Sequence, residues 1–359
     1  MMNDEATESI QNVSKSIKYS SSSSHVNNLS MCKMNTDSIM IASKTLGLNI
    51  SKLSVQCVVA CSSSQKTMYQ SSSRTKHNTS SIESIISKDV ENVDGDAFVS
   101  FNLLCRQECE RICKVLSSHK DLEPIRKMKK SYRVCDRMQI HLKEYSDEIF
   151  ERLKPTLKSR NIYEITFPKT KGYAFEGTWR AVGLNTMWRF IRYRAGGHLA
   201  PHVDGSYVES SERRTMYTVN IYLNDVAEDC GGATVFCEQD QELKYETDEE
   251  RYVVTNILAS VRPISGSALI FQQAPAEILH AGNALKSGLK FMARSGIIYT
   301  RNPETRPRLT SKQQQGIDSL RKAKEAEAAG RFGVAMKFYS KAFKLWPALE
   351  EGDGKIAGI

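Results

Sequence analysis

Residues 188–204 read WRFIRYRAGGHLAPHVD, and this stretch decides the fold that we expect. It opens with an aromatic and β-branched run that favours a strand. After two consecutive glycines it ends in His202 and Asp204, which we place just past the strand end. Side chains two residues apart in extended backbone point the same way, so this imidazole and this carboxylate can reach one metal ion.

A second histidine, His280, follows much later in the chain. Two imidazoles and one carboxylate form the facial triad that holds Fe(II) on one side and leaves the opposite positions free for a cosubstrate and O₂. A single His-X-Asp occurs by chance in many proteins, so the surrounding pattern has to support this interpretation. The three residues together predict an oxygenase.

Short apolar segments divided by Gly and Asp turns surround these residues. The segments are 188–194, 216–223, 231–236, 268–271 and 291–299. Strands of this length with such turns indicate an antiparallel barrel or jelly roll. We therefore predict a mainly β protein with flanking helices.

Four motifs occur in a fixed order along this region. They are Tyr193-x-x-Gly196-Gly197-x-x-x-Pro201-His202-x-Asp204, then Tyr222-Leu223-Asn224-Asp225, then Gly231-Gly232-x-Thr234-x-Phe236, and finally His280-Ala281-Gly282 with Gly288-x-Lys290. With these motifs, residues from about 97 to 301 resemble the prolyl 4-hydroxylase-type family of Fe(II) and 2-oxoglutarate dioxygenases. The resemblance covers somewhat more than half of the chain and implies a double-stranded β-helix, the jelly roll of this family.

The resemblance also implies the roles of single residues. His202, Asp204 and His280 would bind Fe(II), and 2-oxoglutarate would chelate the metal through its keto acid end. Lys290 matches the basic position that pairs with the far carboxylate of 2-oxoglutarate. Arg294 shares a strand face with Lys290, so its guanidinium could share or take over that role. The hydroxyl of Tyr193 could donate to 2-oxoglutarate, although an ordinary core aromatic explains this residue almost as well.

The activity implied by the resemblance is hydroxylation of a C–H bond, with O₂ consumed, succinate and CO₂ released, and ascorbate restoring Fe(II). A peptide or protein substrate is expected, with a prolyl residue first. A small-molecule oxygenase, a nucleic-acid oxygenase and an inert barrel that serves as an interaction scaffold are the alternatives. The polar loop 206–214 could close over substrate, with Arg213 and Arg214 reading an acidic group.

Composition and motifs divide the chain into five parts. We expect a Ser-rich disordered arm over 1–95, because this segment offers too little apolar surface to offset chain entropy. The dioxygenase domain spans 96–301, with bracing helices at about 105–155 and the jelly roll at about 185–301. A linker over 302–311, a helical hairpin over 312–348 and a tail over 349–359 complete the chain.

The hairpin resembles the second half of a tetratricopeptide repeat, through Gly330-x-Phe332-x-x-Ala335-x-x-x-Tyr339-x-x-Ala342-x-x-Leu345-x-Pro347. A single repeat cannot bury its own apolar face, so we expect the hairpin to pack on the oxygenase, on another chain, or on nothing stable. A protein partner that binds these helices is one expectation. A helical pair that only caps the barrel is the other.

Charge and cysteine content restrict the remaining classes. The formal net charge is +9, but the basic run 126–130 lacks interleaved aromatic residues, so we do not expect nucleic acid as a partner. No apolar stretch approaches a membrane span, and the first residues lack the pattern of a signal peptide. Nine cysteines cannot all pair internally, which favours a reducing compartment. We expect a cytoplasmic or nuclear protein without a membrane segment.

Overall fold

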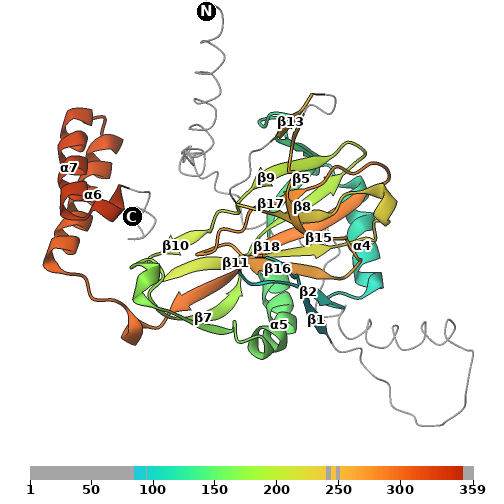
Figure 1. The fold of residues 1–359 in the computed structure, drawn as a ribbon, viewed down its shortest axis with the longest axis horizontal. Helices are drawn as coiled ribbons and strands as arrows, with labels where there is room; N and C mark the ends of the chain where they lie inside the picture. Colours follow the sequence, from blue (N-terminus) through green and yellow to red (C-terminus); the bar gives the residue numbers. More distant parts are fainter. Residues whose placement is uncertain (1–84, 94, 240–243, 248–250, 351–359) are drawn as a thin grey trace, which may run out of the picture.

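The computed structural model describes residues 85–93, 95–239, 244–247 and 251–350 (Figure 1). Its central strand is β18 (Lys290–Arg301), which pairs antiparallel with β11 (Arg213–Tyr222), β8 (Met187–Tyr193) and β7 (Gly177–Leu184). Almost every side chain of β18 and β11 is buried. These strands are therefore covered on both faces.

The described strands form a major and a minor sheet that face each other as a jelly roll. The major sheet runs β1 (Ile86–Asp89), β2 (Ala97–Phe101), β16 (Ala268–Gln272), β11, β18, β8, β5 (Asp136–His141) and β3 (Glu123–Pro124), and it also includes β6 (Glu164–Phe167), β7 and β10 (Val208–Ser210). The minor sheet runs β15 (Ile257–Val261), β12 (Thr234–Cys237), β17 (His280–Gly282), β9 (His198–His202) and β4 (Arg133–Val134). A separate ribbon pairs β13 (Lys244–Glu246) with β14 (Arg251–Val253). The predicted double-stranded β-helix is confirmed.

Two helices cover the outer face of the major sheet, α4 (Arg106–Ser118) and α5 (Lys143–Ser159) (Figure 1). Their apolar faces pack in one core with the outward residues of the sheet, among them Trp188, Phe190 and Ala293. The inward residues Ile191, Tyr222 and Met292 belong to a second core between the sheets. This division follows the period of two along each strand.

Several elements differ from the sequence-based expectation. Residues 198–202 form strand β9, so His202 is the last residue of a strand of its own and does not follow the end of 188–194 directly. Strands β6 and β7 precede residue 185, and β3, β4 and β5 lie between the two bracing helices. Residues 1–84 of the expected arm lie outside the described residues. Strand β1, at residues 86–89, falls inside the range predicted for the arm but pairs with β2 and belongs to the major sheet.

The two cysteines on α4 contribute to packing. Cys109 is fully buried in the core, and Cys113 donates to the carbonyl oxygen of Leu223 at 3.4 Å. All cysteines in the described part of the chain are free thiols. Within the same residues, no helix has both the length and the apolar character needed to cross a membrane.

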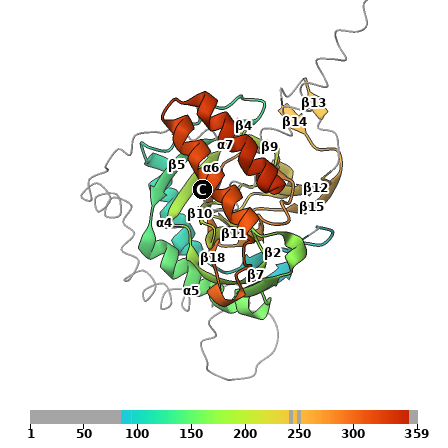
Figure 2. The ribbon, with the colours of Figure 1, turned by 90° about the vertical axis from the view of Figure 1, so that its left-hand side faces the viewer.

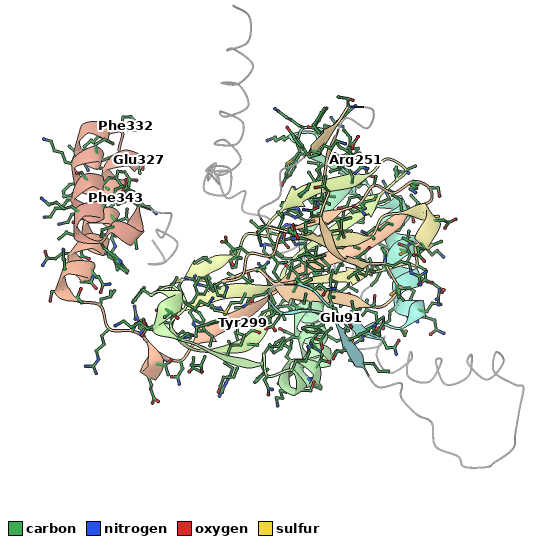
Figure 3. The ribbon with its side chains drawn as sticks, viewed as in Figure 1. Glu91, Arg251, Tyr299, Glu327, Phe332 and Phe343 are labelled. Carbon is green, nitrogen blue, oxygen red and sulfur yellow. The ribbon has the colours of Figure 1, made fainter. Side chains whose placement is uncertain are left out.

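Beyond β18 the chain forms a helical hairpin, α6 (Ser311–Ala328) and α7 (Phe332–Leu345), followed by a short 3₁₀ helix η5 (Pro347–Leu349) (Figure 2). Helix α6 starts with a capping box between Thr310 and Gln313, which fixes its first turn. The hairpin packs on the barrel through the loop before β7, where the rings of Tyr173 and Trp346 meet edge to face at 5.5 Å. Phe332, at the far end, is 67% exposed (Figure 3).

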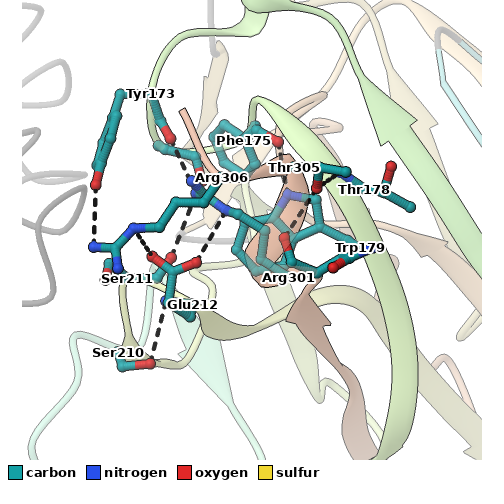
Figure 4. Close-up of polar contacts among 12 residues, drawn as sticks. Tyr173, Phe175, Thr178, Trp179, Ser210, Ser211, Glu212, Arg301, Thr305 and Arg306 are labelled. Carbon is teal, nitrogen blue, oxygen red and sulfur yellow. Dashed lines mark hydrogen bonds and ion pairs between the residues drawn. The ribbon is translucent and has the colours of Figure 1, made fainter. Parts of the chain in front are cut away.

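The linker to the hairpin is held by a polar cluster around the buried Arg301 (Figure 4). Arg301 Nη2 donates to the carbonyl oxygens of Tyr173 and Ala174 at 2.9 and 2.8 Å. Glu212 lies between Arg301 and Arg306, 3.5 and 3.2 Å from their Nε atoms. The end of β18 is thereby tied to the same loop that receives the hairpin.

At its other end, β18 is clamped by Asn224. The side chain donates through Nδ2 to the carbonyl oxygen of Leu289 at 2.8 Å and accepts through Oδ1 from the N–H of Phe291 at 2.7 Å. These bonds hold the backbone on both sides of Lys290. Asn224 therefore fixes the backbone position from which the Lys290 side chain points inward.

We expect Asn224→Ala to lower the free energy of unfolding by about 1–3 kcal/mol, because two hydrogen bonds to the backbone are lost. Chemical denaturation measures this change. Asn302→Ala is the matched control, since the Asn302 side chain accepts one exposed hydrogen bond, from the N–H of Glu304. An Asn224→Ala loss no larger than that of the control contradicts the clamp.

Candidate functional site

Strand pairing brings the two predicted histidines together. In the register between β9 and β17, His202 lies opposite His280, and their ring centroids are 4.3 Å apart. Asp204 follows two residues after His202. One ligand atom from each of the three residues lies within 4.8 Å of the others, a grouping that could hold a metal ion.

Backbone carbonyls orient both imidazoles. Nδ1 of His202 lies 2.9 Å from the carbonyl oxygen of Ala200, and Nδ1 of His280 lies 2.9 Å from that of Ile278. A carbonyl oxygen only accepts, so each Nδ1 carries a proton, and in the neutral imidazole this leaves the lone pair on Nε2. Such bonds to the second nitrogen are typical of metal-binding histidines.

The two oxygens of Asp204 have different neighbours. Oδ2 accepts from the hydroxyl of Thr218 at 2.6 Å, and that hydroxyl accepts from Nε2 of Gln273 at 2.9 Å. Oδ1 lies 3.2 and 3.6 Å from the Nε2 atoms of His202 and His280, and 2.6 Å from Nη2 of Arg294. The chain from Gln273 to Thr218 therefore turns Oδ1 toward the two imidazoles.

Electrostatics favour the forms that bind metal. Burial opposes ionisation of Asp204, but Arg294, His280 and His202 hold its pKa well below the ordinary value. Burial, together with His202, lowers the pKa of His280 to about 3. A neutral His280 beside an ionised Asp204, together with the imidazole of His202, forms a donor set that suits a divalent cation.

These residues line a cavity between the two sheets. The residues that the structure places around it are Arg133, Ile191, Tyr193, Leu199, His202, Asp204, Asn220, Thr234, His280, Ala281, Gly282, Lys290, Met292 and Arg294. All six residues predicted for the site are among them. Asp204 is the one acidic residue in this lining.

Lys290 is buried at one end of the cavity. Its Nζ donates to the carbonyl oxygen of Gly232 at 2.6 Å and lies 5.2 and 5.5 Å from the ring centroids of Tyr193 and Tyr222. Gly232 has φ +72°, and a Cβ there would approach Leu285 Cδ1 to 2.8 Å, so a larger residue would disturb the wall beside Lys290. Burial lowers the pKa of Lys290 to about 7.

Tyr193 and Arg294 take different positions from Lys290. The hydroxyl of Tyr193 interacts with the guanidinium of Arg133, and burial raises the Tyr193 pKa to about 12, so the phenol keeps its proton and can donate it. Arg294 contacts Asp204, at the metal-ligand end of the lining. The two cations on β18 therefore contact different groups: Lys290 contacts the carbonyl oxygen of Gly232, and Arg294 contacts the carboxylate of Asp204.

Sequence reasoning missed Arg133, Thr218 and Gln273. Thr218 lies two residues before Asn220 in one strand, so both side chains point to the inner face, and this alternation was a usable signal. Nothing in the sequence links Arg133 to this cavity. The expected loop 206–214 contains strand β10 and the start of β11, so Arg213 and Arg214 are strand residues. Arg213 pairs with Glu209 at 2.8 Å, and Arg214 lies over the rings of Phe175 and Trp179. Neither is part of the cavity lining.

Comparison with known proteins agrees with this geometry. Residues 188–296 match the family model described as the 2OG-Fe(II) oxygenase superfamily. No curated protein sequence matches the chain.

Solved structures with a similar arrangement are remote in sequence. A viral collagen prolyl hydroxylase from Paramecium Bursaria Chlorella virus-1 is 17% identical over 57% of this chain and 96% of its own, with a TM-score of 0.35. A Pseudomonas putida prolyl-4-hydroxylase is 14% identical over 58% and 94%, with a TM-score of 0.36. HygX from Streptomyces hygroscopicus, with nickel and 2-oxoglutarate bound, is 14% identical over 60% and 86%, with a TM-score of 0.36. Likenesses this weak leave the substrate open.

We expect Thr218→Val to weaken binding of a divalent cation roughly 10-fold or more, because Asp204 loses the donor that orients it. Titration of the apo protein with Mn(II), followed by electron paramagnetic resonance, measures the affinity. Thr166→Val removes a hydroxyl from an exposed pair with Thr178 that is not part of the cavity lining, and it serves as the control. Equal Mn(II) affinity in the two variants contradicts the orienting role.

Proposed function

We propose that the chain is an Fe(II)- and 2-oxoglutarate-dependent dioxygenase that hydroxylates a C–H bond, since residues 188–296 match the family model of the 2OG-Fe(II) oxygenase superfamily. The observation that carries the proposal is the grouping of His202, Asp204 and His280, with ligand atoms within 4.8 Å of one another. Two imidazoles and one ionised carboxylate with ligand atoms this close together form a donor set that suits Fe(II).

His202, Asp204 and His280 would hold the iron. Iron in such a triad supplies the O₂ chemistry that couples oxidative decarboxylation of 2-oxoglutarate to oxidation of a substrate C–H bond. The protein contributes position and the exclusion of water. Both histidines and Asp204 are at least mostly buried, so bulk water has little access to the three ligand atoms.

The far carboxylate of 2-oxoglutarate is assigned to Lys290. Burial disfavours the charged form of the Lys290 amine. A carboxylate bound beside this amine would favour the charged form again through an ion pair. The Tyr193 hydroxyl, which accepts from Arg133, can donate its own proton to the same ligand. Arg294 is four residues further along β18, about 13 Å in extended backbone, so we assign it no part in this contact.

The substrate of this proposal is a peptidyl residue, with proline first, because the ordered motifs of residues 193–290 resemble the prolyl 4-hydroxylase type. Ascorbate is the reductant proposed to return iron to Fe(II). The alternatives are oxidation of a small molecule, oxidation of a nucleic acid, and an inert barrel that serves as an interaction scaffold. The succinate assay below separates an active enzyme from a scaffold, and a substrate screen separates the substrate classes.

The first test is formation of succinate by anaerobically purified protein after addition of Fe(II), ascorbate, 2-oxoglutarate and O₂. We expect succinate from the wild type and at least a 100-fold lower rate from His202→Ala, since one ligand of three is lost. His141→Ala is the control, because His141 is exposed on β5, hydrogen-bonds to Thr186 at 3.1 Å and is not part of the cavity lining. No succinate and no Fe(II) binding by the wild type would remove the catalytic proposal.

A second prediction concerns pH. The Lys290 amine has a pKa of about 7 when free, and a bound carboxylate raises it, so binding above pH 7 requires proton uptake. We expect the affinity for 2-oxoglutarate to fall roughly 10-fold between pH 7 and 8.5, measured by anaerobic calorimetry with Fe(II). In Lys290→Arg the guanidinium stays charged over this range, so its affinity, even if weaker, should not depend on pH in this way. The same pH dependence in both proteins would exclude Lys290 as its source.

A further inference from the structure

Three arginines lie on the inner face of neighbouring strands of the major sheet. Arg189 on β8 is directly opposite Arg294 on β18 in the strand register. On the other side of β8, Arg137 of β5 is opposite Ile191, two residues from Arg189 on the same face. We call Arg137, Arg189 and Arg294 the arginine row.

Their charges are close enough to repel. Burial, followed by Arg294 and Arg137, lowers the pKa of Arg189 to about 10. Burial also lowers the pKa of Arg137, where Arg133 and Arg294 contribute in the same direction. All three side chains are half-buried, and in the described part of the chain Asp204 is the one carboxylate that pairs with Arg294 and also attracts Arg189. Holding three partly desolvated guanidiniums near one carboxylate costs free energy, so a fold does not gain stability from this arrangement alone.

The row lacks protein partners that would balance it. Among the described residues, Arg137 and Arg189 form no hydrogen bond or ion pair, and Asp204 is the one carboxylate that pairs with Arg294. The Nε atom of Arg294 is buried without any acceptor. Donors in this state point to a ligand that supplies the missing acceptors.

The outer face of the same strands shows the contrast. There, Arg192 and Arg194 approach one carboxylate, Asp136, at 2.7 and 3.3 Å. Arginines that serve only the structure of β8 are thus provided with a counter-ion. The arginine row, on the inner face, is not.

The row also lies apart from the proposed 2-oxoglutarate contact. Lys290 and Arg294 occupy the same face of β18 with Met292 between them, about 13 Å from one backbone position to the other. One small carboxylate at Lys290 therefore cannot neutralise the row. Arg294 lines the cavity beside Asp204, and Arg189 and Arg137 continue the row beyond that lining. A second anion at Arg294 would supply negative charge that Lys290 and its ligand do not bring to the row.

We propose that the arginine row binds a carboxylate of the substrate and that the enzyme acts on acidic substrates. Guanidinium groups match carboxylates through paired N–H donors, and a row of them fixes the orientation of the ligand as well as its charge. The carboxylate belongs to an acidic side chain beside the target residue of a peptide or to a small organic acid. This inference rests on the proposed function, because it places the oxidised C–H bond beside the row.

The test is binding of matched acid and amide probes to the full chain with Fe(II) and saturating 2-oxoglutarate, without O₂. The peptide probes are acetyl-Ser-Asp-Pro-Asp-Ser-amide and the same peptide with Asn in place of both Asp residues. The small probes are L-proline and L-prolinamide. Calorimetry gives each dissociation constant without any turnover.

We expect at least one acid probe to bind the wild type 10-fold or more tightly than its amide partner. Arg189→Gln should reduce that ratio to below 2-fold, and Arg189→Lys should leave an intermediate ratio because it keeps the charge and loses the paired donors. Arg180→Gln, which removes an exposed arginine paired with Glu164 on β7, should keep the wild-type ratio. If Arg189→Gln does not fold, Arg137→Gln provides the same comparison.

Preference for the acidic peptide identifies a side-chain carboxylate, and preference for L-proline over prolinamide identifies a small acid. Equal binding of acid and amide probes, absence of binding by both acids, or a ratio that persists in the folded Arg189→Gln and Arg137→Gln variants overturns the inference. Because no O₂ is present, this result is independent of the succinate assay. Failure of catalysis and failure of acid recognition are therefore separate outcomes.

Discussion

The two-sided burial of the central strands is the constraint on which the rest of the structure depends. Strands β8, β11 and β18 are covered by α4 and α5 on one face and by the minor sheet on the other. Because side chains alternate between faces, Phe291 and Ala293 complete the helix-side core while Lys290 and Arg294 must point into the cavity. Any shift of register by one residue would exchange the two sets, so packing of the outer core also sets the position of the inner cations.

The minor sheet imposes the second half of the site. Its strands are short, and β9 pairs with β17 and β4, which are far from it in sequence. The pairing that places His202 opposite His280 therefore forms only when the whole barrel closes. The carbonyl contacts to both Nδ1 atoms then fix the rings, so the two imidazoles reach one point without further adjustment.

The sequence predicted the long, covered strands and the six lining residues because their signals are local: alternation, Gly turns and ordered motifs. It did not reveal β9, since residues 198–202 contain a proline and too few residues to show alternation. It also assigned acid recognition to Arg213 and Arg214, which do not line the cavity, whereas Arg137 and Arg189 lie on the inner face of the major sheet next to Arg294. The strand 188–194 was recognised, and its period of two puts Arg189 on the same face as Tyr193, so that position could have been predicted. Arg137 and Arg133 could not, because their strands are defined by pairing with distant segments.

The arrangement along β18 has a consequence for chemistry. The inner face of β18 carries a cation, Lys290, then an apolar residue, Met292, and then a second cation, Arg294. Asp204, which groups with the two histidines, contacts Arg294. Two anions held at the two ends repel each other less than two anions at one end, and the apolar residue between them keeps the intervening volume poor in water. A cosubstrate and a substrate that are both acidic can therefore occupy one narrow barrel at once. The positive charge that is costly in the empty fold becomes favourable when both are bound.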